Sequence, residues 1–428
     1  MGSRISLRTT VKRILITTLA LFSRLYMKLE LTRIEKACTQ DGIALETGDF
    51  SPILHPMLQE YIRRHTHLPD TQDIFDMLVG ILREKNEIDL AYTMMQKSLS
   101  KRLSILSTYD DPTFQSKVVG TSQGKVVFLS GYYYSGSGAV LDYLEGFDGT
   151  IKWGPKSELR IIKFPGGLAD LLNRLRKKGS LELQDILDLY LHIVGTFHIQ
   201  EPPGTYSMQR MVNTASQIIV HDAKAQGYLH ELLVLFQQIN ELMGIEGIEK
   251  QYITLCRAGL QRAFNAIMIS NHKRILLVDQ GITAWRLPYA ELVVPAQFII
   301  VHRDPRDQLV DANAAKVKHG GREWTAEEFC KLYMQRRKLV AQWVPILEAQ
   351  YGHRCLLVSF EHFVTDHDEE SKRIREFLDL NHMKTGNKQL KFDPTVSIKN
   401  IGKYCSILSK EDIALIEQSC IENIKSLL

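Results

Sequence analysis

The segment from Lys125 to Leu144 constrains the fold of this chain more than any other part of the sequence. Its first residues, Lys125–Ser130 (KVVFLS), form a short apolar run with β-branched side chains, which is typical of a buried strand. A glycine-rich loop follows, and Ala139–Leu144 then has the spacing of an amphipathic helix. A strand, a glycine turn and a helix in this order predict an α/β domain that begins near Lys125.

Three later segments resemble this first strand, and segments with helical periodicity separate them. They are Arg274–Val278 (RILLV), Gln297–His302 (QFIIVH) and Arg354–Ser359 (RCLLVS). Strands that alternate with helices favour a parallel, doubly wound sheet. The stretch from Gly167 to about His272 is mostly helical by pattern and would be a long insertion between strands. We therefore expect an α/β fold with a P-loop-like parallel sheet flanked by helices.

The residues before the first strand have helical patterns. The clearest stretch is Asp70–Arg102, in which Leu78 lies on one apolar face and Met94 on another, with a turn expected at Asn86. This pattern is that of a helical hairpin of the tetratricopeptide kind, without a second copy at a fixed period. The sequence therefore predicts an all-helical N-terminal region.

The polar stretch 109–124, which contains aspartate, proline and glycine, marks the expected domain boundary. We expect the helical region over residues 1–115 and the α/β domain over residues 120–428, with the helical insertion at about 167–272. A chain of 428 residues is long enough for one large domain and a smaller unit.

The start of the chain has apolar residues at spacings of four and three, namely Leu15, Leu19, Phe22, Tyr26 and Leu29. This spacing predicts an amphipathic helix, and its apolar run is far shorter than the roughly 20 residues that span a bilayer. Peripheral contact of this helix with an anionic membrane surface stays open.

Composition narrows the function classes. The formal net charge is +4 and the isoelectric point about 8.5, which is too mild for a nucleic-acid-binding protein and suits a local site for a small anion. The six cysteines form no CxxC pair, which favours reduced thiols in a cytoplasmic protein and no metal site.

The loop after the first strand has the composition of a phosphate site. Its successive backbone N–H groups form a concave nest, and the following helix adds about half a positive charge at its N-terminus. Ser135 and Ser137 add hydroxyl donors. The loop is not a Walker A motif, because Ser137 stands where its lysine should be and Gly138 where its magnesium-binding hydroxyl should be.

This loop and three later segments together resemble the sulfotransferase family. In that family the loop has the form K-[SG]-G-T, and Tyr134-Ser135-Gly136-Ser137 occupies its position, with tyrosine in place of lysine. The resemblance implies that the 5′-phosphosulfate of 3′-phosphoadenosine-5′-phosphosulfate binds here, at Tyr134, Ser135, Gly136, Ser137 and Gly138. The bridging oxygen of this donor then lacks its usual cation, unless Lys156 or Lys163 supplies one.

The second segment is the strand that ends in RDPRD, similar to the family's R-[DN]-P-R-D. Arg303 follows the carboxyl end of this strand, where ligands bind in open α/β sheets. The resemblance implies that Arg303 contacts the 3′-phosphate of the donor, which a planar guanidinium suits. The family's serine eight residues later is Asp311 here, whose charge would repel a phosphate, and Asn313 is a possible substitute.

The third and fourth segments lie near the C-terminus. Val358–Val364 resembles the family's Y-E-D-L segment, in which we expect Glu361 to pair with a base or cap a backbone turn. Ser397–Tyr404 is similar to the late basic loop of carbohydrate and tyrosine sulfotransferases, which implies that Lys399 and Lys403 cover the 3′-phosphate.

A general base is implied by a further likeness. Lys156-Ser157-Glu158-Leu159-Arg160 is similar to the K-E-x-x-F-F segment of glycosaminoglycan-type members, which makes Glu158 the candidate base, with Lys156 and Arg160 beside it. Basic neighbours would make this carboxylate a weak base unless burial offsets them, and an ion pair on a loop is the alternative. His221 is the candidate if the chain uses a histidine, as the cytosolic type does.

The resemblance implies a sulfotransferase that moves a sulfuryl group from 3′-phosphoadenosine-5′-phosphosulfate to an acceptor hydroxyl of a carbohydrate or a glycolipid, by in-line transfer with a general base and without a metal. Two alternatives stay open. One is a degenerate sulfotransferase fold that binds without catalysing, and the other is a P-loop kinase. Donor binding and turnover discriminate between them.

Overall fold

The computed structural model describes residues 69–120, 124–132, 134–153, 159–196, 208–318, 321–383 and 392–422, with shorter stretches at 25–36, 38–40, 43, 45, 50, 52–54 and 57. The chain forms two compact units. The helical unit comprises Met1–Ser107 and Glu182–Ser216, and the sheet unit comprises Thr108–Leu181 and Gln217–Leu428. The predicted division into domains near residue 115 stays a proposal.

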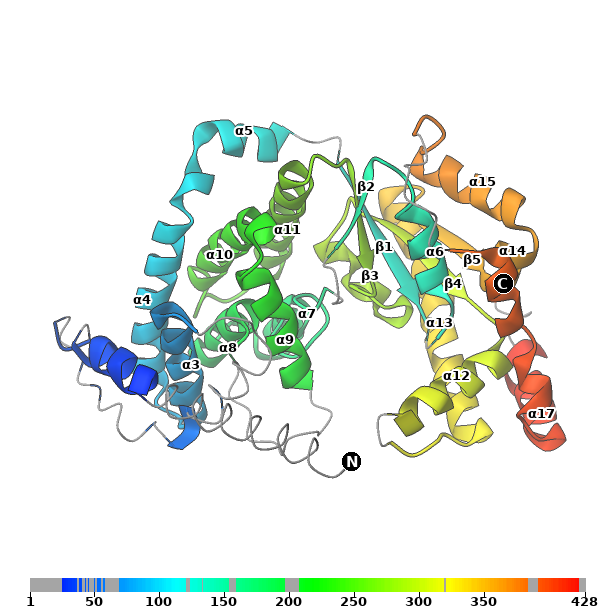
Figure 1. Ribbon diagram of the computed structural model, residues 1–428, viewed down its shortest axis with the longest axis horizontal. Coiled ribbons are helices and arrows are strands. Elements are labelled where there is room, and N and C mark those ends of the chain that lie inside the picture. The colour runs from blue at the N-terminus through cyan, green and yellow to red at the C-terminus, as the bar shows by residue number, and fades with distance from the viewer. Residues whose placement is uncertain are drawn as a thin grey trace, which may run out of the picture. The chain divides into compact units, whose positions relative to one another are not determined.

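A five-stranded parallel sheet organises the sheet unit (Figure 1). Its strands are β1 (Lys125–Gly131), β2 (Thr150–Lys152), β3 (Ile275–Asp279), β4 (Gln297–His302) and β5 (Cys355–Ser359), in the order β2-β3-β1-β4-β5. The predicted fold class is therefore confirmed, with all four predicted strands. β2 was not predicted, because three residues are too few to form an apolar run.

The strands are apolar because both faces of the sheet are covered. On one face, Leu129 and Ile299 belong to a core cluster with side chains of α6 (Ser137–Leu144), α14 (Phe360–Thr365) and α15 (His367–Leu378). On the other face, the Phe128 ring stacks on the Phe298 ring with 5.4 Å between the ring centroids. It also makes an edge-to-face contact with Phe264 of α11 (Glu249–Ser270), with 6.3 Å between the centroids. Parallel strands buried on both faces have continuous apolar sequences, as observed here.

The order of the strands places a switch point at β1. The chain leaves β1 through α6 and returns on the side of β3, whereas β4 pairs with the opposite edge of β1. The register sets Gly131 beside Val301, so β1 and β4 end at the same level. Ligands of open α/β sheets bind at such a point, outside the carboxyl ends of the strands.

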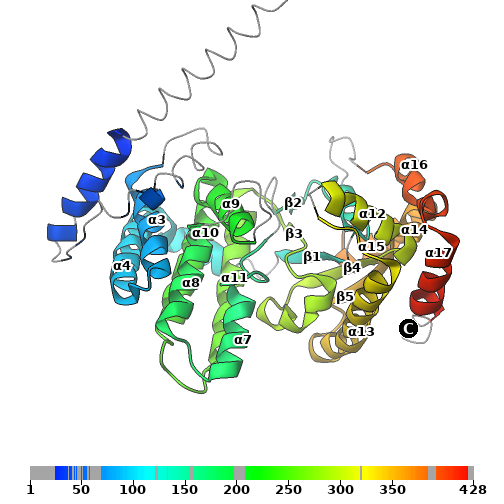
Figure 2. The same ribbon diagram turned by 90° about the horizontal axis from the view of Figure 1, so that it is seen from below.

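Helices connect and cover these strands, and several of those that follow β4 are visible in Figure 2. The stretch 167–272 is mostly helical, as predicted. Three elements lie at or near the limits of the two units, namely η2 (Ser107–Asp110), α9 (Met208–Val220) and η3 (Ala223–Ala225). The remaining elements of the sheet unit are α5 (Pro112–Gly120), α7 (Leu168–Lys178), α10 (Gln226–Asn240), η4 (Ala284–Leu292), α12 (Pro305–Lys318), α13 (Ala326–Tyr351), α16 (Pro394–Ser397), η5 (Ile398–Asn400), η6 (Lys403–Ser406), α17 (Lys410–Ile416) and η7 (Glu417–Glu422).

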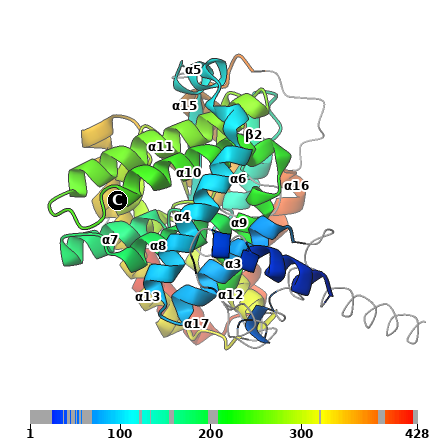
Figure 3. The same ribbon diagram turned by 90° about the vertical axis from the view of Figure 1, so that its left-hand side faces the viewer.

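The helical unit contains the predicted hairpin, formed by α3 (Thr71–Glu84) and α4 (Ile88–Ile105), against which α8 (Leu183–Val194) packs (Figure 3). Asp70 caps α3 with a reciprocal capping box, and the predicted turn at Asn86 has a left-handed φ of 64°. Leu78 and Met94, predicted to lie on apolar faces of the two helices, are both fully buried.

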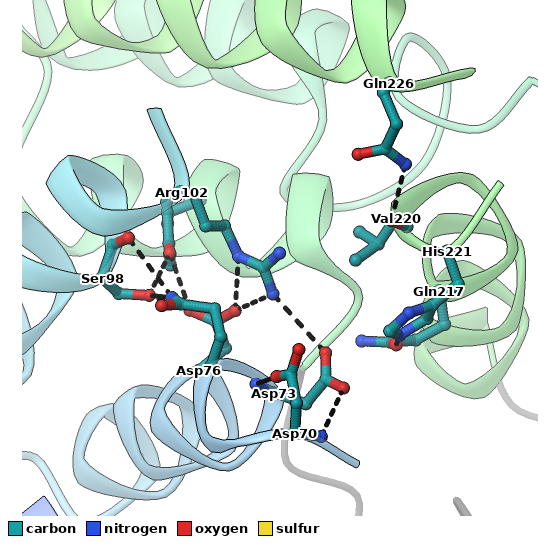
Figure 4. Close-up of polar contacts among 11 residues, drawn as sticks. Asp70, Asp73, Asp76, Ser98, Arg102, Gln217, Val220, His221 and Gln226 are labelled. Carbon is teal, nitrogen blue, oxygen red and sulfur yellow. Dashed lines mark hydrogen bonds and ion pairs between the residues drawn. The ribbon is translucent and has the colours of Figure 1, made fainter. Parts of the chain in front are cut away.

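A buried polar network lies in the core of this unit (Figure 4). Both carboxylate oxygens of Asp76 are bonded, since Arg102 donates to one and the hydroxyls of Ser98 and Tyr190 donate to the other. A second carboxylate, that of Asp73, lies 3.6 Å from the Arg102 guanidinium. A buried charge is tolerated when it is paired and hydrogen-bonded, as this one is.

The predicted amphipathic helix at the start of the chain lies mostly outside the described residues, although residues 25–36 are helical. Within the described ranges, no helix is long and apolar enough to cross a bilayer.

Candidate active site

The loop after β1 is a tight turn held by close packing. The Ser135 hydroxyl accepts from the Tyr132 backbone N–H at 3.2 Å. Gly136 has a φ of 88°, and a β-carbon at this position would lie 2.2 Å from the Phe360 ring. Both the conformation and the space therefore require glycine at the start of α6.

Both loop serines keep a hydroxyl hydrogen to donate. Ser135 Oγ accepts from a backbone N–H, and Ser137 Oγ accepts from the Gln280 side-chain amide at 2.8 Å. A hydroxyl that accepts in this way still has its own hydrogen for another acceptor. Gly138, on the first turn of α6, is exposed, and backbone N–H groups at a helix start have no carbonyl four residues earlier in the helix to bond; in this turn Ala139 bonds back to the Gly136 carbonyl at 2.9 Å. The loop thus offers several donors to an anion.

Gln280, whose role was not predicted from the sequence, connects the loop to the end of β3. Its backbone is left-handed with a φ of 49°, and its N–H donates to the Leu129 carbonyl at 3.0 Å. The signal in the sequence is a polar residue directly after a buried strand and before a glycine, at the edge where ligands bind.

Lys163 brings a cation to this edge. Its side chain is 8% exposed, and its ammonium donates to the Gln280 backbone carbonyl. The Gln280 side chain in turn bonds Ser137 of the loop. Of the two lysines considered as substitutes for the missing loop lysine, Lys156 lies outside the described residues.

Tyr134, which stands where the family has that lysine, takes another role. It is 49% exposed and has a left-handed φ of 48°. Its backbone carbonyl accepts from Arg303 Nη1 at 3.1 Å, which connects the loop to the end of β4.

The guanidinium of Arg303 is buried and surrounded by acceptors. Besides the Tyr134 carbonyl, it donates to Asp311 Oδ2 at 2.6 Å and to the Asn400 carbonyl. Its plane lies over the Phe360 ring, 5.1 Å from the centroid. Three of the five N–H bonds of this side chain are therefore directed at groups of the chain itself.

Asp311 is shared between two cations. Its Oδ1 accepts from Lys403 at 2.5 Å, while its Oδ2 accepts from Arg303. Lys399, the other predicted lysine, is exposed. Asn313, considered as a phosphate ligand, instead fixes a turn. Its side-chain amide donates to the Trp324 backbone carbonyl at 3.0 Å and accepts from the Trp324 backbone N–H at 2.9 Å.

Two carboxylates hold the segments of the site together. Asp307 on α12 is fully buried and accepts from the backbone N–H groups of Gly402 and Tyr404 at 2.8 and 3.0 Å, which fixes the C-terminal loop. Glu361 accepts from the Asp304 backbone N–H at 2.8 Å and from the Ser359 hydroxyl. The capping role predicted for Glu361 is confirmed, whereas the role of Asp307 was not recognised from the sequence.

Two titratable groups at this edge, His302 and Tyr132, are uncharged at ordinary pH. Burial, helped by the Arg337 guanidinium, lowers the pKa of His302 to about 4, so this imidazole is neutral at ordinary pH. Burial also raises the pKa of Tyr132 to about 12. The charged side chains described around the loop and the end of β4 include those of Lys163, Arg303, Arg337, Lys403, Asp307, Asp311 and Glu361.

The candidate base segment is described in part. Glu158 and Lys156 lie outside the described residues. Arg160 places its guanidinium 4.8 Å from the centroid of the Phe164 ring, in the same turn as Lys163. His221, the alternative base, lies within 3.1 Å of the Gln217 side chain through its Nε2.

Comparison with known proteins finds a family model that matches part of the chain. Residues 199–384 match the model described as the Sulfotransferase family. Among solved structures, the chain is similar to sulfotransferase STF9 from Mycobacterium avium (12% identity, 67% of this chain and 73% of that one, TM-score 0.31). It is also similar to sulfotransferase STF1 from Mycobacterium tuberculosis H37Rv (11% identity, 78% and 93%, TM-score 0.33). No curated protein matches the sequence. The family match includes Arg303 and Glu361, while the loop at 131–138 precedes it.

Proposed function

Residues 199–384 belong to the sulfotransferase family, enzymes that transfer sulfuryl groups, and we propose that this chain takes the sulfuryl group from 3′-phosphoadenosine-5′-phosphosulfate. The observation that carries the proposal is the link between the loop after β1 and the end of β4, formed by Arg303 and the Tyr134 carbonyl at 3.1 Å. One side of this link offers loop N–H and hydroxyl donors, and the other offers Arg303 and Lys403.

The donor would bind with its 5′-phosphosulfate on the loop and its 3′-phosphate toward Arg303 and Lys403. The loop suits an anion because a glycine-rich turn that leads into a helix presents backbone N–H groups and the positive end of the helix dipole. Lys163 lies beside the loop and would take the role of the missing loop lysine, which is to stabilise the charge that develops on the departing phosphate.

The transfer itself needs positioning and charge stabilisation. The acceptor oxygen forms a bond to sulfur while the sulfur–oxygen bond to the phosphate breaks, and the nucleotide leaves as adenosine 3′,5′-bisphosphate. The proton of the acceptor hydroxyl passes to a base, for which we propose Glu158, flanked by Lys156 and Arg160. The proposed transfer requires no metal ion.

We propose a carbohydrate or a lipid-linked sugar as the acceptor. The support is the likeness of residues 156–160 to the base segment of glycosaminoglycan-type members. Peripheral membrane contact through the N-terminal helix and a cytoplasmic location belong to the same proposal.

A second candidate function is a binding module that has lost catalysis. Two observations favour it, namely the tyrosine at the position of the loop lysine and the carboxylate of Asp311 against Arg303. A kinase is a weaker candidate, because the loop lacks both the Walker lysine and the metal-binding hydroxyl.

Turnover separates these functions. The full chain is incubated with 3′-phosphoadenosine-5′-phosphosulfate and a panel of oligosaccharide acceptors, and release of adenosine 3′,5′-bisphosphate is measured. A sulfotransferase releases it in proportion to sulfated acceptor, whereas a binding module binds the nucleotide without release. Preference for ATP with magnesium would indicate a kinase.

We expect Glu158→Gln to lower turnover by about a hundredfold, the low end for general-base catalysis because cationic neighbours weaken this base. Affinity for adenosine 3′,5′-bisphosphate should stay unchanged, as measured by calorimetry. Glu369→Gln, at an exposed glutamate of α15, is the matched control. Equal turnover of Glu158→Gln and wild type would remove Glu158 as the base.

A further inference from the structure

The charges proposed to receive the donor's 3′-phosphate already contact an anion of the chain itself. Asp311 stands eight residues after Arg303 on α12, where the resemblance places a serine. Its two carboxylate oxygens are each bonded by one cation, Oδ2 by Arg303 at 2.6 Å and Oδ1 by Lys403 at 2.5 Å. The carboxylate thus makes the two charged contacts that a phosphate would make there.

The surroundings hold this arrangement in place. Arg303 is buried and fixed from three sides by the Tyr134 carbonyl, the Asn400 carbonyl and Asp311. Lys403 is the first residue of η6, and the N–H groups on either side of it bond Asp307. Asp311 therefore faces two cations whose positions are set by other contacts.

The charge at this place follows by addition. Arg303 and Lys403 contribute +2 and Asp311 contributes −1, so these three side chains together carry +1, and the buried carboxylate of Asp307 next to Lys403 lowers the local charge further. A donor's 3′-phosphate would have to displace the carboxylate or bind beside it against charge repulsion. Either process removes much of the affinity that two free cations would provide.

We infer that Asp311 substitutes for the donor's 3′-phosphate, so that this chain also accepts a nucleotide sulfate without that group, adenosine 5′-phosphosulfate. This inference rests on the proposed function, since it uses the same loop and the same transfer. The sulfur–oxygen bond to the phosphate breaks, the acceptor oxygen bonds to sulfur, the acceptor proton goes to the base, and adenosine 5′-phosphate leaves.

The test compares the two nucleotide products as ligands. Calorimetry on the full chain measures the affinities for adenosine 5′-phosphate and adenosine 3′,5′-bisphosphate in wild type, Asp311→Ser and Asp311→Asn. Asp368→Ser, at an exposed aspartate of α15, is the control variant. Circular dichroism confirms that each variant is folded.

We expect the wild type to bind the two nucleotides within about tenfold of each other, because the 3′-phosphate gains little where a carboxylate already sits. Asp311→Ser and Asp311→Asn should raise the affinity for the bisphosphate by about thirtyfold or more and leave that for adenosine 5′-phosphate within about twofold. Wild-type enzyme should also release adenosine 5′-phosphate from adenosine 5′-phosphosulfate in the presence of acceptor.

Two results would overturn the inference while the proposed function stands. One is a wild-type preference for the bisphosphate of a hundredfold or more. The other is an equal change in both affinities in the Asp311 variants, which would indicate a structural role for this residue. If neither nucleotide binds the wild type, the proposed function and the inference fall together.

Discussion

We expect Lys163→Met to lower turnover by about 10²–10³-fold, the usual effect of removing one group that stabilises developing charge. The loop after β1 has no lysine. The buried ammonium of Lys163 donates to the Gln280 backbone carbonyl, and the side chain of the same Gln280 donates to the Ser137 hydroxyl of the loop. Negative charge that moves onto the departing phosphate would therefore meet this ammonium. The measurement is the steady-state release of nucleotide from 3′-phosphoadenosine-5′-phosphosulfate.

Ligand truncation separates a direct role of Lys163 from a structural one. Adenosine 3′-phosphate lacks the 5′-phosphate that Lys163 would face, so Lys163→Met should weaken binding of the bisphosphate and leave binding of adenosine 3′-phosphate unchanged. Lys163→Arg should restore part of the turnover because it keeps the charge. Lys372→Met, at an exposed lysine of α15, is the control. Turnover of Lys163→Met within threefold of wild type would contradict the assignment.

Arg102→Met should destabilise the helical unit by about 3–5 kcal/mol, the range for breaking a buried ion pair from one side. The substitution leaves Asp76 fully buried with the hydroxyls of Ser98 and Tyr190 as its remaining partners. Urea-induced unfolding followed by circular dichroism gives the change in the free energy of unfolding.

Two further variants make this test specific to the pair. Lys101→Met, at an exposed position of the same helix, should change stability by less than about 0.5 kcal/mol. Asp76→Leu combined with Arg102→Met should recover part of the lost stability, because no buried charge is then left alone. An unfolding midpoint for Arg102→Met equal to that of the wild type would show that the network contributes nothing.

The sequence predicts those parts of the fold that local pattern determines. β1, β3, β4 and β5 are apolar runs because helices cover both faces of the sheet. α3 and α4 show helical spacing because their buried apolar side chains recur at intervals of three and four residues. β2 has no such pattern, since three residues at the sheet's edge give too short a signal. The order of the strands was not predicted either, because it depends on contacts between distant residues.

In the candidate site, too, some residues were predicted from the sequence and others were not. Arg303 and the loop after β1 were predicted from their position at strand ends and from their motifs. Gln280 and Asp307 were missed, because their roles arise from hydrogen bonds to residues 143 and 95 positions away in the sequence. Likewise, a pattern shows that Asp311 replaces a serine, but only the fold shows that its carboxylate contacts both Arg303 and Lys403.

Arg303 and the loop after β1 together form the proposed site for a nucleotide sulfate donor. Calorimetric titration of the full chain with adenosine 3′,5′-bisphosphate, beside the Arg303→Ala variant, tests this proposal most directly. We predict micromolar binding that Arg303→Ala weakens by about 2 kcal/mol or more, since the substitution removes the anchor of the Tyr134 carbonyl in the loop and leaves the negative charge of Asp311 without its Arg303 partner beside the nucleotide. An absence of binding by the wild type, or equal binding by Arg303→Ala, would contradict the proposal.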